Sequence, residues 1–305
     1  MDNLVRIAKQ KIDLLLAGGL CAGALLLYMR TLAPTMASIY DDSTEFPLVV
    51  YRLAIAHPTG YPLYTVLGKL FTLLLPVRDI AYRLNMLSAL CAAGAVAMLY
   101  LASRRLGVHP VAAISAGGLL AVSPVFWSQA IIAEVYALNT LFVAMILALA
   151  IAYGRSEAHR LTTLLALAFS AGLSLTHHRT IVLLFLPLLL YIVLSELRAP
   201  RAVRLRLTAA VILKLVILFA LPSLLYAYIP LRGMAASSID GTYQNTLRGF
   251  TSWILGSSYT IFLRSNPLNQ PALSASAYLA LLMEQFSLGG LILAVIGAGW
   301  LFLRR

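Results

Sequence analysis

Charged residues are scarce in this chain of 305 residues: Asp, Glu, Lys and Arg make up 11% of it, and 61% is hydrophobic. A soluble domain has about 25% charged residues, so this composition excludes an ordinary soluble protein. The chain has only two cysteines, Cys21 and Cys91, and both lie inside apolar runs. Their spacing fits neither a metal site nor a disulfide framework. The composition therefore predicts a protein that lives in a bilayer.

Acidic residues are scarcer than basic ones, with 11 Asp and Glu against 23 Lys and Arg, which gives a formal charge of +12. In a soluble protein this excess would indicate nucleic acid as a partner. Here the basic residues stand in short clusters between apolar runs, a pattern typical of membrane topology and of contact with anionic lipid. We therefore expect membrane lipid, and no nucleic acid, among the partners.

A spanning helix needs about 20 mostly apolar residues, and this length criterion predicts eight spans. A ninth apolar stretch, Tyr61 to Pro76, is shorter, has Pro62 near its start and contains Lys69. The eight predicted spans cover residues 12–30, 83–103, 110–127, 132–153, 161–177, 180–197, 208–229 and 287–303.

The positive-inside rule decides how the short ninth stretch is placed. If it does not span, every dense basic cluster falls on the cytoplasmic side, together with both termini; if it does span, all later clusters move outside. We therefore predict an interfacial or re-entrant helix on the outer side. The basic start resembles a signal peptide but lacks a cleavage pattern, which favours a retained signal anchor.

This topology predicts one membrane domain, residues 1–305, with two substantial outer loops. The first outer loop covers residues 31–82 and the last covers residues 230–286. Most of the unusual polar residues fall on the outer side, so we expect an extracytoplasmic site.

The first outer loop contains the densest acidic stretch, with Asp41, Asp42 and Glu45 inside five residues. In a helix, Asp41 and Glu45 are four apart and Asp42 and Glu45 three apart, so either pair could share a face. A carboxylate at the membrane edge could act as general base toward a hydroxyl group, with its pKa set by partial desolvation. The alternative is a solvated acidic cap at a helix start.

A rigid turn follows at Ala56-His57-Pro58-Thr59-Gly60-Tyr61-Pro62, where two prolines and a glycine force the chain to reverse. His57 could bind a phosphate when protonated, or relay a proton. The simpler interpretation is a turn histidine bonded to backbone. We expect Tyr61, in the same turn, to contact substrate.

Other outer-side residues gather near predicted span ends. A carboxylate at the depth of Glu134 is costly unless it faces a polar cavity or a cation. The pair His177 and His178 is poorly placed to share one metal ion, whereas Arg179 could form a bidentate fork with phosphate. Lipid-headgroup contact by the arginines is the common alternative. The expected substrate-binding residues are Asp41, His57, Tyr61, Glu134, Tyr136, His177, His178, Arg179 and Arg232.

Several of these stretches, in this order, resemble a family of polytopic GT-C type glycosyltransferases that includes polyprenyl-phosphate-mannose-dependent protein O-mannosyltransferases. The resemblance covers most of the chain, and its first-loop motifs are specific. It is carried by Ala33-Pro34-Thr35, Asp42-Ser43-Thr44-Glu45-Phe46, His57-Pro58-Thr59-Gly60-Tyr61-Pro62-Leu63, Arg83-Leu84-Asn85-Met86-Leu87-Ser88-Ala89, Ala133-Glu134-Val135-Tyr136-Ala137-Leu138 and Tyr228-Ile229-Pro230-Leu231-Arg232.

The resemblance implies an all-α GT-C type bundle of about eight transmembrane helices, with interfacial helices in the extracytoplasmic first loop. It implies an inverting enzyme that transfers a sugar, expected to be mannose, from a polyprenyl-phosphate donor to the hydroxyl of a protein or glycan acceptor. Asp42 is the first choice for the base and Glu45 the second. No metal or other cofactor is implied. The expected location is a bacterial inner membrane or the endoplasmic reticulum.

Two alternatives stay open at this point. A transporter or flippase for a lipid-linked anion would need polar groups on both halves of the membrane, and the inner halves of these spans are almost purely apolar. An inactive, glycosyltransferase-like subunit is the other alternative, since Asp41 and Thr44 depart from the family pattern.

Overall fold

The computed structural model describes residues 2–38, 41–155, 159–260 and 274–303. Within these residues the regular elements are helices, with one isolated bridge between Ile55 and Ser238. Six helical segments are long and apolar enough to cross a membrane, which confirms the predicted all-α polytopic membrane protein. They are Ala8–Thr31, Ile80–Arg105, Tyr136–Arg155, Arg179–Arg198, Ala209–Gly233 and Ala275–Trp300.

Two of the eight predicted spans do not form single long helices. Helices α5 (Pro110–Val122) and α6 (Pro124–Ala130) meet at a 66° bend and would make a seventh span if counted together. The bend lies where Ser123 takes an extended conformation, as expected of a residue before proline. Helix α8 (Arg160–Leu175) has 16 residues, which is short for a 30 Å hydrocarbon layer.

Two predicted boundaries were wrong. The span predicted over 132–153 is α7 (Tyr136–Arg155), so Glu134 lies in the irregular segment before the helix and not at its start. The last helix, α14 (Ala275–Leu303), begins well before the predicted 287 and contains a non-helical break at Ser287, φ 59° and ψ 167°. The irregular part of the predicted last loop is correspondingly shorter than 230–286.

Helix α4 (Ile80–Arg105) lies at the centre and packs against α1 (Asp2–Thr31), α5 and α7. Its buried face is rich in alanine, which lets neighbouring backbones approach closely. Helix α8 packs against both α7 and α10 (Ala209–Ala220). At Gly172 an added Cβ would lie 2.0 Å from the Phe219 carbonyl oxygen, so only glycine fits this contact. Helix α9 (Val182–Arg198) covers α7 from another side.

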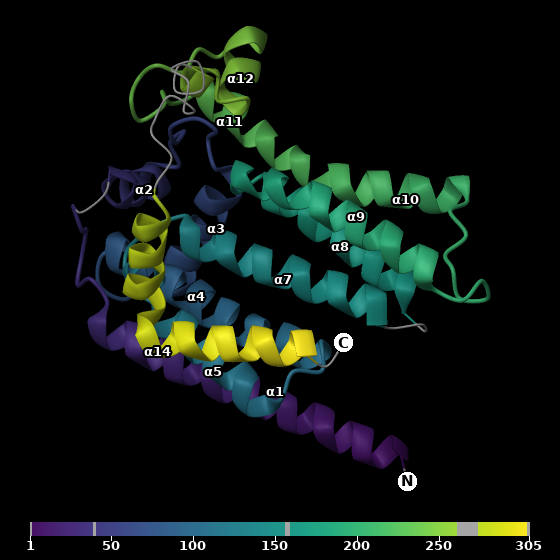
Figure 1. Ribbon diagram of the computed structural model, residues 1–305. Helices are drawn as coiled ribbons and strands as arrows, with labels where there is room; N and C mark the ends of the chain where they lie inside the picture. The colour runs from purple at the N-terminus through teal and green to yellow at the C-terminus, as the bar shows by residue number, and fades with distance from the viewer. Residues whose placement is uncertain (1, 39–40, 156–158, 261–273, 304–305) are drawn as a thin grey trace.

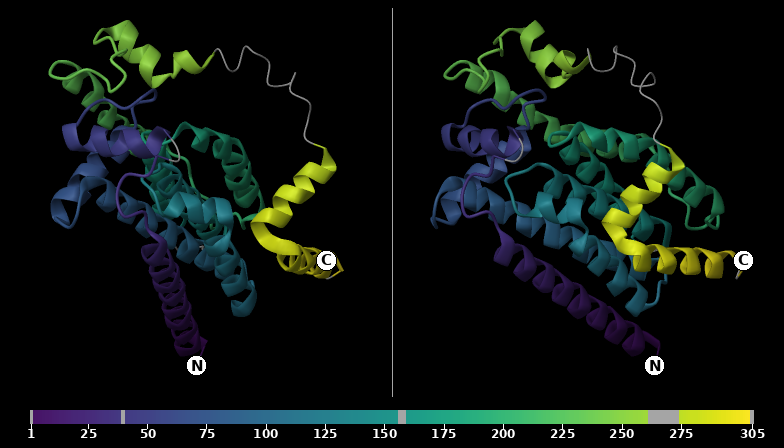
Figure 2. Two further views of the ribbon diagram at one scale, coloured as in Figure 1. Left: turned by 90° about the vertical axis from the view of Figure 1, so that its left-hand side faces the viewer. Right: turned by 60° about the vertical axis from the view of Figure 1, so that its left-hand side comes forward.

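Short helices gather at one end of the bundle, as Figures 1 and 2 show. They are α2 (Asp41–Arg52), α3 (Pro62–Leu74), α11 (Tyr228–Gly233) and α12 (Leu247–Ile254), with the 3₁₀ turns η1 (Arg179–Ile181), η2 (Leu221–Ala227) and η3 (Ser257–Tyr259). The first turn of α1 and the last turn of α14 lie at the opposite end. Helix α3 is about 20 Å long at 1.5 Å per residue, so its predicted interfacial or re-entrant placement stays a prediction.

The chain between α2 and α3 is fastened by the last part of the protein. The Tyr228 hydroxyl donates to the Ala54 carbonyl (2.8 Å), and the Trp253 indole donates to the Ala56 carbonyl (3.1 Å). The Ile239 amide donates to Ile55 (3.0 Å). Segments about 180 residues apart in sequence therefore fix the position from which His57 projects.

Candidate active site

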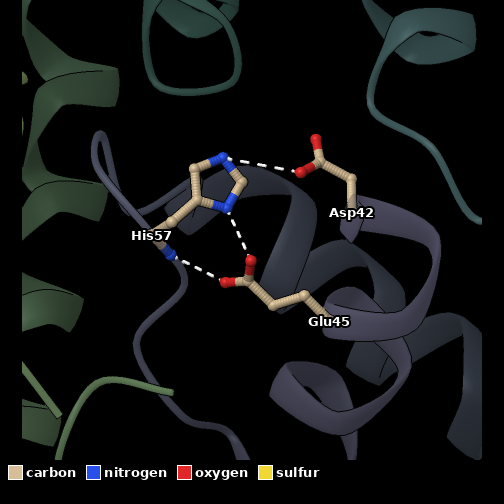
Figure 3. Close-up of side chains that lie close together, drawn as sticks. All are labelled: Asp42, Glu45 and His57. Atoms are coloured by element: carbon tan, nitrogen blue, oxygen red, sulfur yellow. Dashed lines mark hydrogen bonds and ion pairs between the residues drawn. The ribbon is translucent and has the colours of Figure 1, made fainter. Parts of the chain in front are cut away.

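Helix α2 and the turn after it bring two carboxylates and one imidazole together (Figure 3). The Glu45 carboxylate accepts two hydrogen bonds from His57, one from the backbone amide (2.8 Å) and one from ring Nδ1 (2.7 Å). Asp42, one helical turn earlier, places Oδ1 3.8 Å from His57 Nε2. The side chains of all three residues are 16 to 24% exposed, so the cluster is largely buried but in contact with solvent. Asp42, Glu45 and His57, which are close in sequence, are therefore also close in space.

Electrostatics favour the protonated form of His57. Burial acts to lower the pKa of His57, but the hydrogen bond to Glu45 and the negative charges of Glu45, Asp42 and Asp240 together raise it above its ordinary value. An imidazolium held between two carboxylates makes a compact site with a net negative charge. Such a site suits proton transfer at a hydroxyl group.

Aromatic rings form the wall beside this cluster. Tyr61 packs against His57 (centroids 4.9 Å apart), Phe46 (5.4 Å) and His178 (5.9 Å). Tyr136 lies against the other side of His178 at 5.6 Å. Four residues predicted to bind substrate, from three separate stretches of the chain, are thus in one continuous set of ring contacts. Burial and the nearby carboxylates raise the pKa of Tyr61 far above its ordinary value, so its hydroxyl stays neutral.

Glu134 is the most unusual acidic residue of the site. Its side chain is 1% exposed, and neither carboxylate oxygen has a hydrogen-bond partner among the described residues. Burial, and next the charge of Asp42, raise the pKa of Glu134 to about 8. The Tyr64 hydroxyl and the His177 Nδ1 atom are also buried without partners there. Buried polar groups without partners mark places where water or a ligand belongs.

The two histidines of the turn between α8 and α9 are neutral. Burial lowers the pKa of His177 to about 3, and its Nε2–H donates to the Val135 carbonyl (2.8 Å). Burial, followed by the charge of His57, lowers the pKa of His178, whose Nδ1 bonds the Thr180 hydroxyl (2.8 Å). His178 can therefore offer its Nε2–H, and no positive charge, to a bound anion. His177 has its N–H engaged with Val135 and presents only an acceptor nitrogen, Nδ1.

The two arginines are engaged in the fold. Arg179 donates from Nη1 to the Leu255 carbonyl and so joins the α8–α9 turn to α12. Arg232 donates to the Leu53 and Arg52 carbonyls (2.6 and 3.1 Å) and so caps the last turn of α2. The first turn of α2, which carries Asp42, is about 16 Å away at 1.5 Å per residue. Arg232 therefore positions α2, and its direct contact with substrate stays a prediction.

Asp41 begins α2, but its side chain lies outside the part of the structure that is described. Sequence reasoning missed Asp240, whose charge acts on His57 and whose carboxylate is bound by Ser238 (2.6 Å) and Thr242 (2.7 Å). The Asp-Gly pair at 240–241 indicates a turn, but nothing in sequence places that turn beside His57. Tyr259 was also missed. Burial, followed by the charges of Asp42 and Glu45, raises the pKa of Tyr259.

A divalent cation could find ligands in the same cluster. One atom each from Asp42, Glu45 and His57 lies within 4.8 Å of the others. A histidine that gives one ring nitrogen to a carboxylate often binds a metal through the other, and here Nδ1 is given to Glu45 while Nε2 faces Asp42. The sequence implied no metal at this position.

These features define an all-α polytopic membrane protein in which a cluster of carboxylates and histidines lies at one end of the bundle. The sequence profile described as "Protein O-mannosyl-transferase TMEM260 N-terminal domain" matches residues 42–202, which is more than half of the chain. The chain belongs to this family, and the predicted relation to protein O-mannosyltransferases is confirmed.

Two relatives carry the same name. The mouse protein O-mannosyl-transferase TMEM260 is 34% identical over 224 residues, which are 72% of this chain and 31% of the relative. The protein O-mannosyl-transferase tmem260 of Dictyostelium discoideum is 27% identical over 292 residues, 89% of this chain and 34% of the relative. The chain thus spans about a third of the length of these relatives. No solved structure matches it.

Proposed function

We propose that this chain is the membrane domain of an inverting GT-C type glycosyltransferase that transfers mannose from a polyprenyl-phosphate donor to a protein Ser or Thr hydroxyl. The observation that carries the proposal is the cluster of Asp42, Glu45 and His57 at one end of an apolar helical bundle. The names of the two relatives support the reaction class.

Asp42 is the proposed general base. Glu45 accepts two hydrogen bonds from His57, and Asp42 is the second carboxylate of the cluster, with Oδ1 3.8 Å from His57 Nε2. An acceptor hydroxyl that approaches Asp42 can pass its proton to the carboxylate as its oxygen attacks the sugar carbon. The phosphate leaves from the opposite face with the bond electrons, and it needs little acid assistance. The imidazolium of His57 keeps the local charge low enough for an anionic donor to enter.

The donor is proposed to lie with its phosphate at the rim of the outer cap, which is the segment from α11 to η3, Tyr228 to Tyr259. His178 offers a neutral hydrogen-bonding ring, and Arg179 lies in the next position along the chain. The exposed apolar surface of α9 suits a polyprenyl chain, since Leu183 and Leu186 are 80 and 76% exposed. Tyr61 and Tyr136 would flank the sugar.

The acceptor is proposed to approach over the outer cap. A polar cavity of about 450 Å³ lies there, lined by hydroxyl, amide and guanidinium groups of Thr242, Gln244, Arg248, Ser252 and others. Thr242 also binds Asp240, whose charge reaches His57. A polypeptide seated in this cavity would have a route to Asp42.

The site is proposed to face the extracytoplasmic side. The opposite end of the bundle carries Arg104, Arg105, Arg155 and Arg198 at the ends of α4, α7 and α9. The positive-inside rule places such an end, and with it the first turn of α1, on the cytoplasmic side.

The test uses the purified chain in nanodiscs with synthetic polyprenyl-phosphate mannose and a panel of Ser- and Thr-containing peptides. The expected result is peptide-dependent mannose transfer, with the opposite anomeric configuration in the product by nuclear magnetic resonance. Tight donor binding without release of sugar to any acceptor would overturn the enzyme proposal and favour transport of the lipid. Retained anomeric configuration would overturn the inverting mechanism alone.

A further inference from the structure

A second polar cavity lies at the end of the bundle opposite to the candidate active site. Its volume is about 600 Å³, and helices α7, α8 and α9 and the turn after α9 enclose it. Three arginines line it, Arg155, Arg160 and Arg198, with no acidic residue in the lining. The reaction proposed above makes no use of this cavity.

One arginine belongs to the framework of the cavity. Arg160 is 5% exposed, pairs with Glu196 and stacks on the Tyr153 ring at 4.5 Å. The second oxygen of Glu196 accepts the Leu205 amide (3.0 Å). The charge of Arg160 is therefore neutralised and fixed in place.

The other two arginines keep their charge for a ligand. Arg155 donates one hydrogen bond to the Leu106 carbonyl (3.3 Å), and no carboxylate of the described residues pairs with it. The guanidinium group of Arg198 makes no hydrogen bond or ion pair with the other described residues. Tyr191, Ser195 and Arg198 also line the cavity, and their spacing of four and three residues puts them on one face of α9.

The surface beside the cavity is apolar. Leu190, Leu194 and Leu197 on α9 are 57, 39 and 62% exposed, and α9 is one of the segments able to span a membrane. Leu190 and Leu194 precede Arg198 at four-residue intervals, so an apolar stripe leads along the helix to the guanidinium group. A molecule with an anionic head and a hydrocarbon tail matches this order of surfaces.

We propose that this cavity binds the phosphate group of an anionic phospholipid, with Arg155 and Arg198 as its charged ligands and Tyr191 and Ser195 as hydroxyl donors. Guanidinium groups form paired hydrogen bonds to phosphate oxygens. Basic pockets between transmembrane helices are suited to such headgroups. The bound lipid would join α7 to α9 at the end of the bundle remote from the active site.

The test titrates the delipidated full chain in detergent with phosphatidylglycerol or phosphatidylcholine and measures bound lipid by native mass spectrometry. The expected result is saturable binding of one phosphatidylglycerol in preference to phosphatidylcholine. Arg155→Gln and Arg198→Gln should each weaken it about tenfold, the scale of one lost hydrogen bond between charged groups. Arg201→Gln is the matched control, because Arg201 is exposed in the same turn but does not line the cavity.

Equal binding of the two lipids, or equal weakening by all three substitutions, would overturn the proposal. Inorganic phosphate is added in a separate arm to distinguish the two sources of phosphate. Failure of millimolar phosphate to displace the lipid supports a lipid headgroup. If phosphate displaces the lipid from the parent but not from Arg198→Gln, the lipid assignment is overturned in favour of a soluble anion. None of these outcomes depends on transferase activity.

Discussion

Substitution of Glu134 by glutamine should change how the stability of the protein depends on pH. Glu134 is buried and its carboxylate oxygens lack partners among the described residues, so burial and Asp42 raise its pKa to about 8 from an ordinary 4.5. The folded protein therefore holds a proton here that the unfolded chain has already released. The stability contributed by this proton is fully present below pH 4.5 and is lost as the pH rises toward 8.

The size of the stability loss follows from the difference between the pKa of Glu134 in the folded protein and in the unfolded chain. One proton contributes about 1.36 kcal/mol per pH unit, so the parent should lose up to roughly 4 kcal/mol between pH 5 and 8 through Glu134. Glutamine cannot ionise, and Glu134→Gln should escape this loss. A constant offset is also expected, because the new amide group needs partners of its own. The pH dependence of the difference, and not the offset, is therefore diagnostic.

The assay is thermal unfolding of purified parent and variant in detergent at pH 5, 6, 7 and 8. The melting temperature of Glu134→Gln should rise relative to that of the parent at each step. Glu284→Gln, at an exposed position on α14, serves as the control and should follow the parent throughout. A difference between Glu134→Gln and the parent that is the same at all four pH values would refute a buried, protonated Glu134.

Two further substitutions test how the site is held. Glu45→Gln removes the charge that helps to raise the pKa of His57, and should destabilise the protein by about 2 kcal/mol. This loss should be greatest below pH 6.5 and shrink as the pH rises through the pKa of folded His57, as read from melting curves; a loss that grows with pH would contradict the pairing. Arg232→Ala should destabilise the protein by about 1–3 kcal/mol by uncapping α2. Arg232→Lys should recover only part of this, because lysine lacks the guanidinium fork, and full recovery would show that charge alone matters.

Hydropathy predicted the long helices well, because the length of an apolar run is a direct physical requirement of a bilayer. It failed where backbone conformation changes inside an apolar run. The irregular segment before Tyr136 leaves the hydropathy pattern unaltered. The bend at Pro124, by contrast, follows from a visible proline, and the pattern could have indicated it.

The site was predicted in part. The acidic helix and the proline-bounded turn are close in sequence, so the meeting of Asp42, Glu45 and His57 could be inferred. The capping of α2 by Arg232 could not be inferred from the sequence. The partners of Arg232 are backbone carbonyls, which are the same for every residue type. The nearness of Asp240 to His57 likewise depends on how the outer cap folds back, which no local pattern encodes.

The motif residues outside the site have a structural explanation. Asn85 donates its side-chain amide to the carbonyls of Ala33 (2.9 Å) and Thr35 (3.1 Å), so two separate motifs of the sequence meet. Arg83 donates to the Thr72 and Val77 carbonyls (2.9 and 2.7 Å) and closes the end of α3. The motifs therefore hold the first loop in place around the candidate base.

The most direct test of the central claim compares Asp42→Asn with the parent in two measurements on the same samples, donor binding and mannose transfer. The variant should bind polyprenyl-phosphate mannose with unchanged affinity, while turnover falls by about 10² to 10⁴, the usual contribution of a general base. An unchanged melting temperature confirms that both samples are folded. Asp42→Asn that transfers mannose at the parent's rate would contradict the assignment of Asp42 as the base.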